Sequence, residues 1–94
     1  MIRSFKEAWF EDVVRTGKAP KRFPAELVRS VQRKVAMIAA AVVLEDLRQP
    51  PGNRLEALSR DRQGQHSIRV NDQWRLCFVW KDDAAEELEF VDYH

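Results

Sequence analysis

The tripeptide Pro50-Pro51-Gly52 divides the 94-residue chain into two parts whose apolar residues repeat at different intervals. Proline lacks a backbone N–H and clashes with the preceding helical turn, so a helix does not continue through this point. Before the break, apolar residues recur every three or four positions, as on one face of a helix. After it they alternate with polar residues, as in a strand. The chain is therefore predicted to be α+β, with its helices first and its sheet second.

Two helices are predicted before the break, preceded by a short edge strand at residues 1–3. The first helix begins at a capping box, Ser4-Phe5-Lys6-Glu7, and ends at Gly17. The second begins near Pro24, which suits a first-turn position, and runs to the prolines. Their apolar faces consist of Phe5, Trp9 and Val13 in the first, and of Leu27, Val31, Val35, Ile38 and Val42 in the second. We expect both faces to cover one side of the sheet.

The second half predicts an antiparallel meander. A short strand at residues 54–58 is followed by three alternating segments, around residues 66–70, 74–80 and 88–93. Register follows the apolar face, because a slip of one residue inverts every side chain. A three-residue turn at 71–73 therefore places Ile68 opposite Leu76 and Arg69 opposite Arg75.

The last hairpin is predicted to have a five-residue loop, residues 82–86, which pairs Trp80 with Leu88 and Phe78 with Phe90. This register brings Tyr93 beside Arg75. Facing arginines repel unless an anion lies between them. We therefore expect the less apolar face of the sheet to expose Arg69, Arg75 and Tyr93, with Asp92 and His94 at its edge. The alternative is that these arginines only solvate the sheet.

Length and composition favour one domain over residues 1–94. The single cysteine, Cys77, lies in an apolar run and is expected to pack as a small hydrophobe. Two distant histidines and one cysteine do not make a metal-ligand set, so neither a metal nor a cofactor is predicted. His66 is expected to be a packed, hydrogen-bonded residue of the apolar face. The longest apolar stretch, residues 35–44, is too short to span a bilayer, and no signal peptide is recognisable, which favours a cytoplasmic protein.

Charge is segregated along the chain. Residues 48–81 carry seven Lys or Arg and three acids, whereas residues 82–94 carry six acids and no Lys or Arg. A basic middle segment is what phosphate binding requires. The acidic end either masks that patch or solvates an edge.

The chain closes on Asp92-Tyr93-His94, three proton-handling side chains in a row. Together with an arginine they suit cleavage of an RNA phosphodiester, in which the 2′-hydroxyl is an internal nucleophile. Arg75 would stabilise the transition state, because guanidinium binds phosphate bidentately. His94 would be general acid or base, Tyr93 would stack on a base or position the phosphate, and Asp92 would orient His94 or share the proton transfer. Which group is the acid and which the base stays open.

Three sequence blocks resemble the HigB toxins of the RelE superfamily, most closely their GraT-type "killer protein" members. The blocks are Pro-Pro-Gly-Asn-Arg-Leu-Glu-Ala-Leu at residues 50–58, Ser-Ile-Arg-Val-Asn-Asp-Gln-Trp-Arg at 67–75, and the final Asp-Tyr-His. The resemblance spans the whole chain. It implies a RelE-like microbial ribonuclease fold, with two N-terminal helices on a small, mostly antiparallel sheet.

The resemblance also implies a function. Such a toxin is a metal-independent, ribosome-dependent endoribonuclease that cleaves mRNA in the decoding site and inhibits translation. It implies a HigA-type helix-turn-helix antitoxin as partner, with operator DNA bound only through the antitoxin. By motif position the catalytic arginine falls on Arg75, and the terminal catalytic group on Asp92, Tyr93 and His94.

The chain departs from the family pattern at two places. Ser59-Arg60 stands where many relatives have Lys-Gly, so a phosphate-binding lysine is missing, and Arg60 or Arg62 is expected to replace it. Arg54 and Arg69 are also expected to bind RNA phosphates. Glu56 stands where some relatives have histidine. We expect a weak toxin. The alternatives are an inactive binding module that acts as a co-repressor with its antitoxin, and a ribosome-independent ribonuclease.

Overall fold

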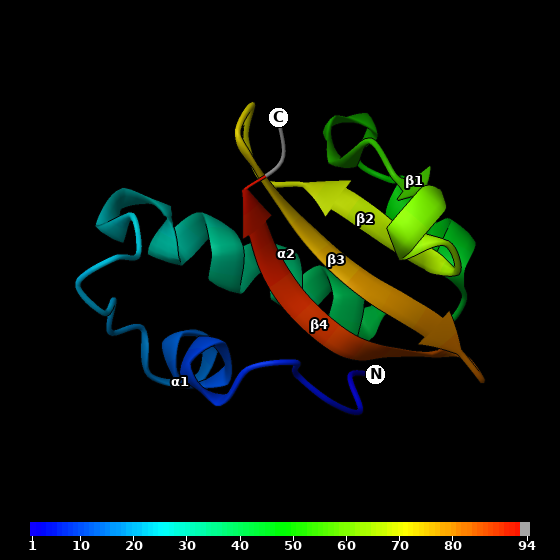
Figure 1. Ribbon diagram of the computed structural model, residues 1–94. Helices are drawn as coiled ribbons and strands as arrows, with labels where there is room; N and C mark the ends of the chain where they lie inside the picture. Colours follow the sequence, from blue (N-terminus) through cyan, green and yellow to red (C-terminus); the bar gives the residue numbers. More distant parts are fainter. Residues whose placement is uncertain (93–94) are drawn as a thin grey trace.

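In the computed structural model, which describes residues 1–92, two helices lie against one face of a four-stranded sheet (Figure 1). The helices are α1 (Ala8–Thr16) and α2 (Val28–Ala40). The strands are β1 (Glu56–Ala57), β2 (Gln65–Arg69), β3 (Trp74–Lys81) and β4 (Ala84–Asp92). They are antiparallel in the order β1-β2-β3-β4. Short 3₁₀ helices, η1 to η4, occupy Ala25–Leu27, Leu44–Arg48, Pro51–Asn53 and Arg60–Arg62. The predicted α+β architecture is confirmed.

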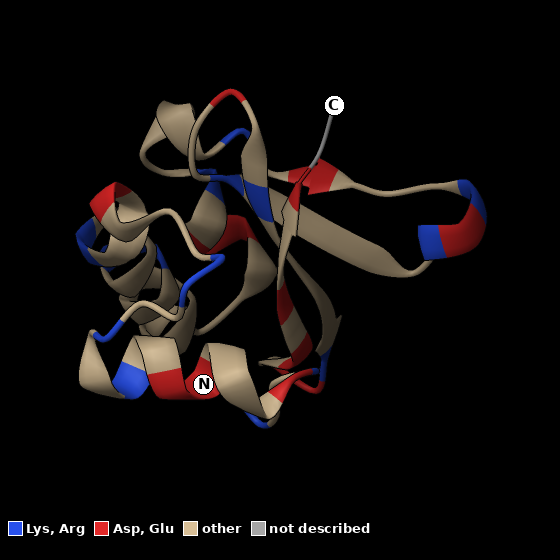
Figure 2. Cartoon of the chain, turned by 60° about the vertical axis from the view of Figure 1, so that its left-hand side comes forward, with Lys and Arg blue, Asp and Glu red and all other residues tan. Residues whose placement is uncertain are grey.

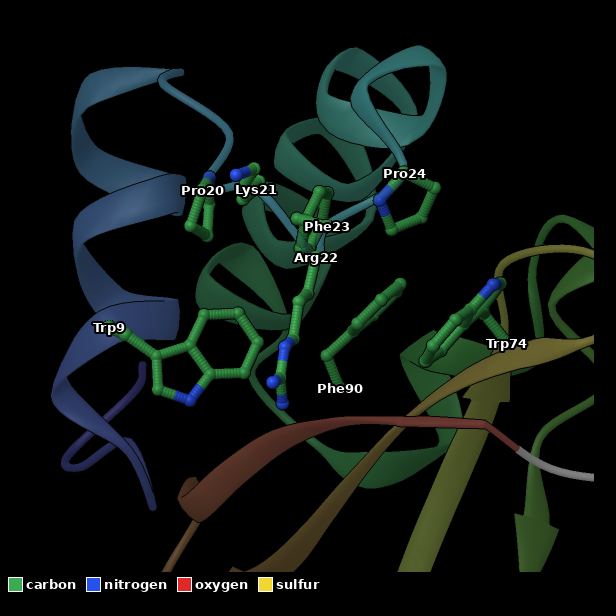
Figure 3. A pocket seen from close by; sticks show the side chains of 8 residues that line it. All are labelled: Trp9, Pro20, Lys21, Arg22, Phe23, Pro24, Trp74 and Phe90. Atoms are coloured by element: carbon green, nitrogen blue, oxygen red, sulfur yellow. The ribbon is translucent and has the colours of Figure 1, made fainter.

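The core lies between the helices and the sheet. Helix α2 contributes Val31, Val35 and Ile38, helix α1 contributes Phe10 and Val13, and the sheet contributes Ile68, Leu76, Phe78 and Leu88. Charged residues lie on the outer surfaces of the helices, in the loops and along β4 (Figure 2). Near one end of the core the rings of Phe23, Phe90 and Trp74 are stacked (Figure 3). Burial of this apolar surface is the main force that holds helices to sheet.

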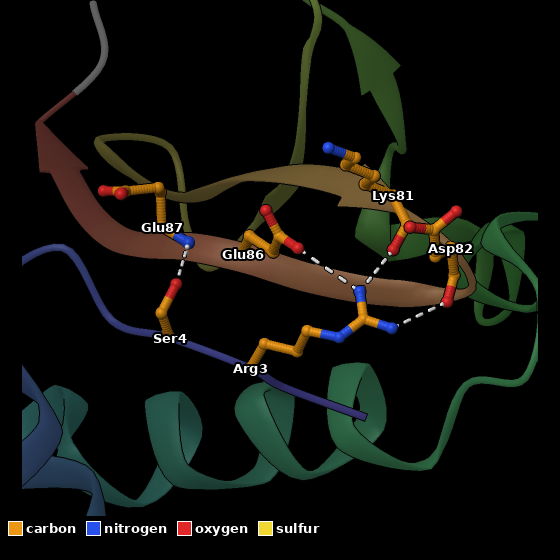
Figure 4. A network of polar contacts seen from close by, with 6 residues as sticks. All are labelled: Arg3, Ser4, Lys81, Asp82, Glu86 and Glu87. Atoms are coloured by element: carbon orange, nitrogen blue, oxygen red, sulfur yellow. Dashed lines mark hydrogen bonds and ion pairs between the residues drawn. The ribbon is translucent and has the colours of Figure 1, made fainter.

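The capping box predicted for the first helix is wrong. Helix α1 begins at Ala8, and Glu7 at its N-cap makes no side-chain capping bond. The segment before α1 instead runs beside β4 and forms isolated parallel bridges to it, at Ile2 with Ala85 and at Phe5 with Leu88. The Ser4 hydroxyl therefore accepts a hydrogen bond from the Glu87 N–H at 2.9 Å (Figure 4). The expected C-terminus is confirmed, since Gly17 adopts the left-handed conformation with φ 75°.

Helix α2 ends ten residues before Pro50, not at the prolines. The Asp46 carboxylate accepts the backbone N–H groups of Val42 and Val43, at 2.9 and 3.2 Å, and starts the 3₁₀ helix Leu44–Arg48. Such local bonds compete with continuation of a helix. Val42, predicted on the buried face, is 70% exposed as a result.

The predicted register of β2 with β3 is confirmed, because Ile68 pairs with Leu76 and Arg69 with Arg75. The register of β3 with β4 was predicted wrongly. The hairpin turn consists of only Asp82 and Asp83, both with positive φ, as in a type I′ turn. A bulge at Glu87 (φ 56°) then shifts the pairing by one residue, so that Leu88 and Phe90 point into the core. The bulged register sets Leu76 opposite Phe90, Trp74 opposite Asp92, and Arg75 opposite Val91 rather than Tyr93.

Candidate functional site

The sheet face opposite the helices carries polar side chains that are buried and bonded to one another. Its central side chains are Ser67, Arg75, Cys77 and Glu89, and all four are buried. Arg62 from η4 covers this face and donates to Glu89 Oε1 at 2.6 Å and to Gln65 Oε1 at 3.0 Å. The expectation that this face exposes its arginines is therefore wrong at its centre, where Arg75 is buried.

Arg75 is the most firmly held member of this face. Its Nε donates to Ser67 Oγ at 2.7 Å, and its Nη2 donates to the Arg54 carbonyl oxygen at 2.6 Å. The same Nη2 lies 3.1 Å from Glu56 Oε1. Arg75 is only 7% exposed, contrary to the predicted exposure. The reason is that β1 and the segment before it fold over β2 and bring acceptors to the guanidinium.

The Arg75–Glu56 pair joins a buried cation to an accessible anion. The Glu56 side chain is 54% exposed, so solvent reaches the pair from the carboxylate side. Guanidinium binds carboxylate and phosphate through the same N–H groups. A phosphate that approached from this side would thus compete with Glu56 for Arg75.

The segment that supplies the Arg54 carbonyl is fixed by a buried asparagine. Asn53 is fully buried; its Nδ2 donates to the carbonyl oxygens of Leu47 and Gln49, at 3.1 and 3.2 Å. Its Oδ1 accepts from Lys34 Nζ at 2.5 Å. Burial, followed by the charges of nearby arginines, lowers the pKa of Lys34. The contacts that Asn53, Ser67 and Glu56 make around Arg75 were not predicted from the sequence. The only indication was that all three residues lie in the segments that resemble HigB toxins, residues 50–58 and 67–75.

The four arginines predicted to bind phosphate fall into two groups. Arg54 and Arg60 are exposed, and both have positive φ, 45° and 58°. Arg62 and Arg69 are partly buried and ion-paired, Arg62 with Glu89 and Arg69 with Asp72. Because Asp72 neutralises Arg69, the pairing of Arg69 with Arg75 does not require a bound anion between them.

The terminal group is described only as far as Asp92. Asp92 ends β4, and its Oδ2 accepts from Gln73 Nε2 at 3.1 Å. Asp92 pairs with Trp74, the neighbour of Arg75, and adjacent residues of a strand point to opposite faces. The structure therefore does not bring the Asp92 and Arg75 side chains together on one face. The predicted site residues Tyr93 and His94 lie outside the described residues.

His66 lies on the helix-facing side of β2, as predicted, opposite Phe78. It is half-buried, but its Nδ1 is buried without a hydrogen-bond partner among the described residues, so that part of the expectation is wrong. Within residues 1–92, no three His, Cys, Asp or Glu side chains gather where they could hold a metal ion. Over the same residues, no helix has the length and apolarity needed to cross a membrane.

Solved structures share this fold at low sequence identity. The YoeB–YefM complex from Staphylococcus aureus superposes with a TM-score of 0.62 at 17% identity, covering 100% of this chain and 98% of that chain. The YoeB/ParE toxin from Agrobacterium tumefaciens superposes with a TM-score of 0.51 at 15% identity, over 99% of each chain. The chain therefore shares its fold with these YoeB and ParE toxins.

Sequence comparison identifies the family. Residues 3–94 match the family described as "RelE-like toxin of type II toxin-antitoxin system HigB". Toxin HigB-1 of Vibrio cholerae is 40% identical over 94 residues, covering 100% of this chain and 98% of that protein. Endoribonuclease HigB of Proteus vulgaris is 32% identical over 98 residues, covering 100% of both. The chain therefore belongs to the HigB family of RelE-like toxins of type II toxin–antitoxin systems.

Proposed function

We propose that this toxin is a ribosome-dependent endoribonuclease that cleaves mRNA in the decoding site by metal-independent acid–base chemistry and so inhibits translation. Membership of the HigB family supports this proposal, as does the name endoribonuclease for its Proteus vulgaris relative. The observation that carries it is the fixed orientation of the Arg75 guanidinium, held by Ser67 and the Arg54 carbonyl. A preorganised donor of this kind stabilises transition-state charge without reorganising during the reaction.

The residues would divide the work as follows. Arg75 neutralises the charge that develops on the phosphorane, after the substrate phosphate displaces Glu56. Tyr93 and His94 position the phosphate and transfer protons between the 2′-hydroxyl and the leaving 5′-oxygen, and Asp92, whose side chain lies on the other face from Arg75, orients His94. The exposed Arg54 and Arg60 bind flanking phosphates directly. Arg62 and Arg69 also bind phosphates, after these displace their carboxylate partners Glu89 and Asp72.

The proposed partners are a HigA-type helix-turn-helix antitoxin, the ribosome and mRNA, in the cytoplasm. Operator DNA would be bound only through the antitoxin. The solved YoeB–YefM complex supports an antitoxin partner for this fold. The partly basic surface of residues 48–81 supports contact with RNA.

Primer extension on mRNA tests the proposal. Purified toxin is added to one message, either bound to programmed ribosomes or naked, and new 5′ ends are mapped. We expect new ends within the decoding-site codon on ribosomes and far fewer on naked RNA. Equal cleavage of naked RNA would instead identify a ribosome-independent ribonuclease.

The second candidate is a toxin-like co-repressor without catalysis. It is favoured by one observation: Glu56 already occupies the Arg75 guanidinium. In that case no new 5′ ends appear with ribosomes, while the toxin still strengthens operator binding by its antitoxin in a gel-shift titration.

A further inference from the structure

Glu89 is a buried carboxylate that two cations from distant parts of the chain share. Its side chain is 11% exposed and lies on the polar face of the sheet, opposite Cys77. Arg62 Nη1, from η4, lies 2.6 Å from Glu89 Oε1, and Lys6 Nζ lies 3.6 Å from the same oxygen. Lys6 belongs to the segment that runs beside β4 before α1 begins (Figure 1), where its N–H donates to the Leu88 carbonyl at 3.0 Å. One carboxylate thus fastens both this N-terminal segment and η4 to the sheet.

The two cations are held differently. Arg62 donates a hydrogen bond to Glu89, whereas the 3.6 Å separation of Lys6 from Glu89 is that of an ion pair without a hydrogen bond. The Lys6 side chain is also half-exposed. Because its ammonium is carried on a flexible stem, it can approach Glu89 by a change of rotamer while the Lys6 backbone stays bonded to β4. Lys6 is therefore placed to become the closer partner of Glu89.

Glu89 needs such a partner when Arg62 binds a phosphate. The exchange takes the guanidinium away from Glu89, and a buried carboxylate that loses its partner destabilises the protein strongly. Cys77 cannot replace Arg62, because burial raises the pKa of its thiol and a neutral thiol is only a weak donor. Arg75, on the same face, is already held by its own acceptors. Lys6, already at ion-pair distance, carries the charge that is needed.

We propose that Lys6 is a positioning residue, which closes on Glu89 as Arg62 turns from Glu89 to an RNA phosphate. In the free toxin Glu89 is bonded to Arg62, and in the RNA-bound toxin it is bonded to Lys6. The buried charge stays compensated in both states, so Lys6 strengthens RNA binding without touching RNA. The inference rests on the proposed function, in which Arg62 binds a phosphate, and adds the residue that makes this exchange possible.

The test measures RNA affinity by fluorescence anisotropy, with an oligonucleotide whose 2′-hydroxyls are methylated to prevent cleavage. K6Q removes the charge of a half-exposed side chain and is expected to bind RNA about three- to ten-fold more weakly than wild type. K6R keeps the charge and should bind like wild type. The matched control K81Q removes an exposed charge at the end of β3 far from Arg75, and should lose less than about two-fold in affinity.

A double-mutant cycle separates this role from a direct contact between Lys6 and RNA. The effect of K6Q is measured again in E89Q, where the buried charge is gone, and in R62Q, where no guanidinium is released. In both backgrounds K6Q is expected to lower RNA affinity no more than K81Q does. The second background replaces a partly exposed side chain, so the cycle does not depend on the folding of E89Q.

Three outcomes would overturn the inference in distinguishable ways. An equal loss of affinity on K6Q in wild type, E89Q and R62Q would show that Lys6 contacts RNA directly. Wild-type affinity in K6Q, with weaker binding in R62Q, would reject the role of Lys6 and leave the proposed function in place. Wild-type affinity in R62Q would show that Arg62 does not bind RNA, so that the proposed function is wrong on this point and the inference fails with it.

Discussion

Replacing Glu56 by glutamine tests whether the Arg75 guanidinium binds the substrate phosphate or only stabilises the fold. The substitution keeps a hydrogen-bond acceptor beside Arg75 and removes the negative charge that competes with phosphate. The account predicts two effects of opposite sign: E56Q binds RNA more tightly than wild type, and it unfolds more easily.

The size of the effect follows from the geometry. A charge pair at the observed 3.1 Å is worth about 1 kcal/mol in water and about 5 kcal/mol at an effective dielectric constant of about 20. Because the Glu56 side chain is 54% exposed, the lower figure applies, in line with about 0–1 kcal/mol for accessible ion pairs. Removing the competitor should therefore raise RNA affinity by up to about five-fold. The free energy of unfolding should fall by about 1 kcal/mol or less.

The assay is fluorescence anisotropy with an RNA oligonucleotide whose 2′-hydroxyls are methylated, so that binding is measured without cleavage. Urea unfolding gives the stability. E11Q, at an exposed carboxylate of α1, makes the same change in net charge away from Arg75 and corrects for general electrostatics. If E56Q binds RNA no more tightly than E11Q while losing stability, Glu56 and Arg75 form a structural pair and the proposed role of Arg75 in phosphate binding is wrong.

Three further predictions concern the framework around the site. N53A should lower the free energy of unfolding by about 2–4 kcal/mol in urea, because it removes the hydrogen bonds to Lys34, Leu47 and Gln49 and leaves these buried groups unsatisfied; wild-type stability would contradict this. Burial raises the pKa of the Cys77 thiol, so native toxin should react slowly with Ellman's reagent. Because the unfolded thiol ionises first, this thiol makes stability fall as pH rises above about 8.5, a trend that C77A should lack. Backbone N–H groups lower the pKa of Asp46, so acid unfolding should begin at lower pH in D46N than in wild type, relative to each protein's neutral stability.

The hydrophobic pattern correctly predicted strand pairing where one face of the sheet is buried and the alternation is unbroken. The pairing of β2 with β3 followed from matching Ile68 to Leu76, because any slip would expose the core face. The β3–β4 register could not be read in this way, since the bulge at Glu87 changes the alternation partway along the strand. Ser4 satisfied the local rule for a helix cap, but its segment pairs with β4, about eighty residues later in the chain.

The candidate site was predicted only as a set of residue types. Sequence blocks pointed to Arg75, but its burial depends on Ser67, Glu56 and the Arg54 carbonyl. Ser67 lies on the other strand of the same hairpin, whereas the Arg54 carbonyl is 21 residues from Arg75 in sequence and reaches it, with Glu56, only through the pairing of β1 with β2. The left-handed conformation of Arg54, which aims its carbonyl, has no simple signature, because such backbone conformations usually favour glycine.

Cleavage by an R75K variant tests the central claim, that the Arg75 guanidinium stabilises the transition state of RNA cleavage. Lysine keeps the positive charge and the flexible stem but loses the planar fork that binds two oxygens at once. With ribosome-bound mRNA, the account predicts that R75K, still folded and still bound by antitoxin, cleaves at least about 100-fold more slowly than wild type. A folded R75K toxin that produces the same 5′ ends at the wild-type rate would contradict it.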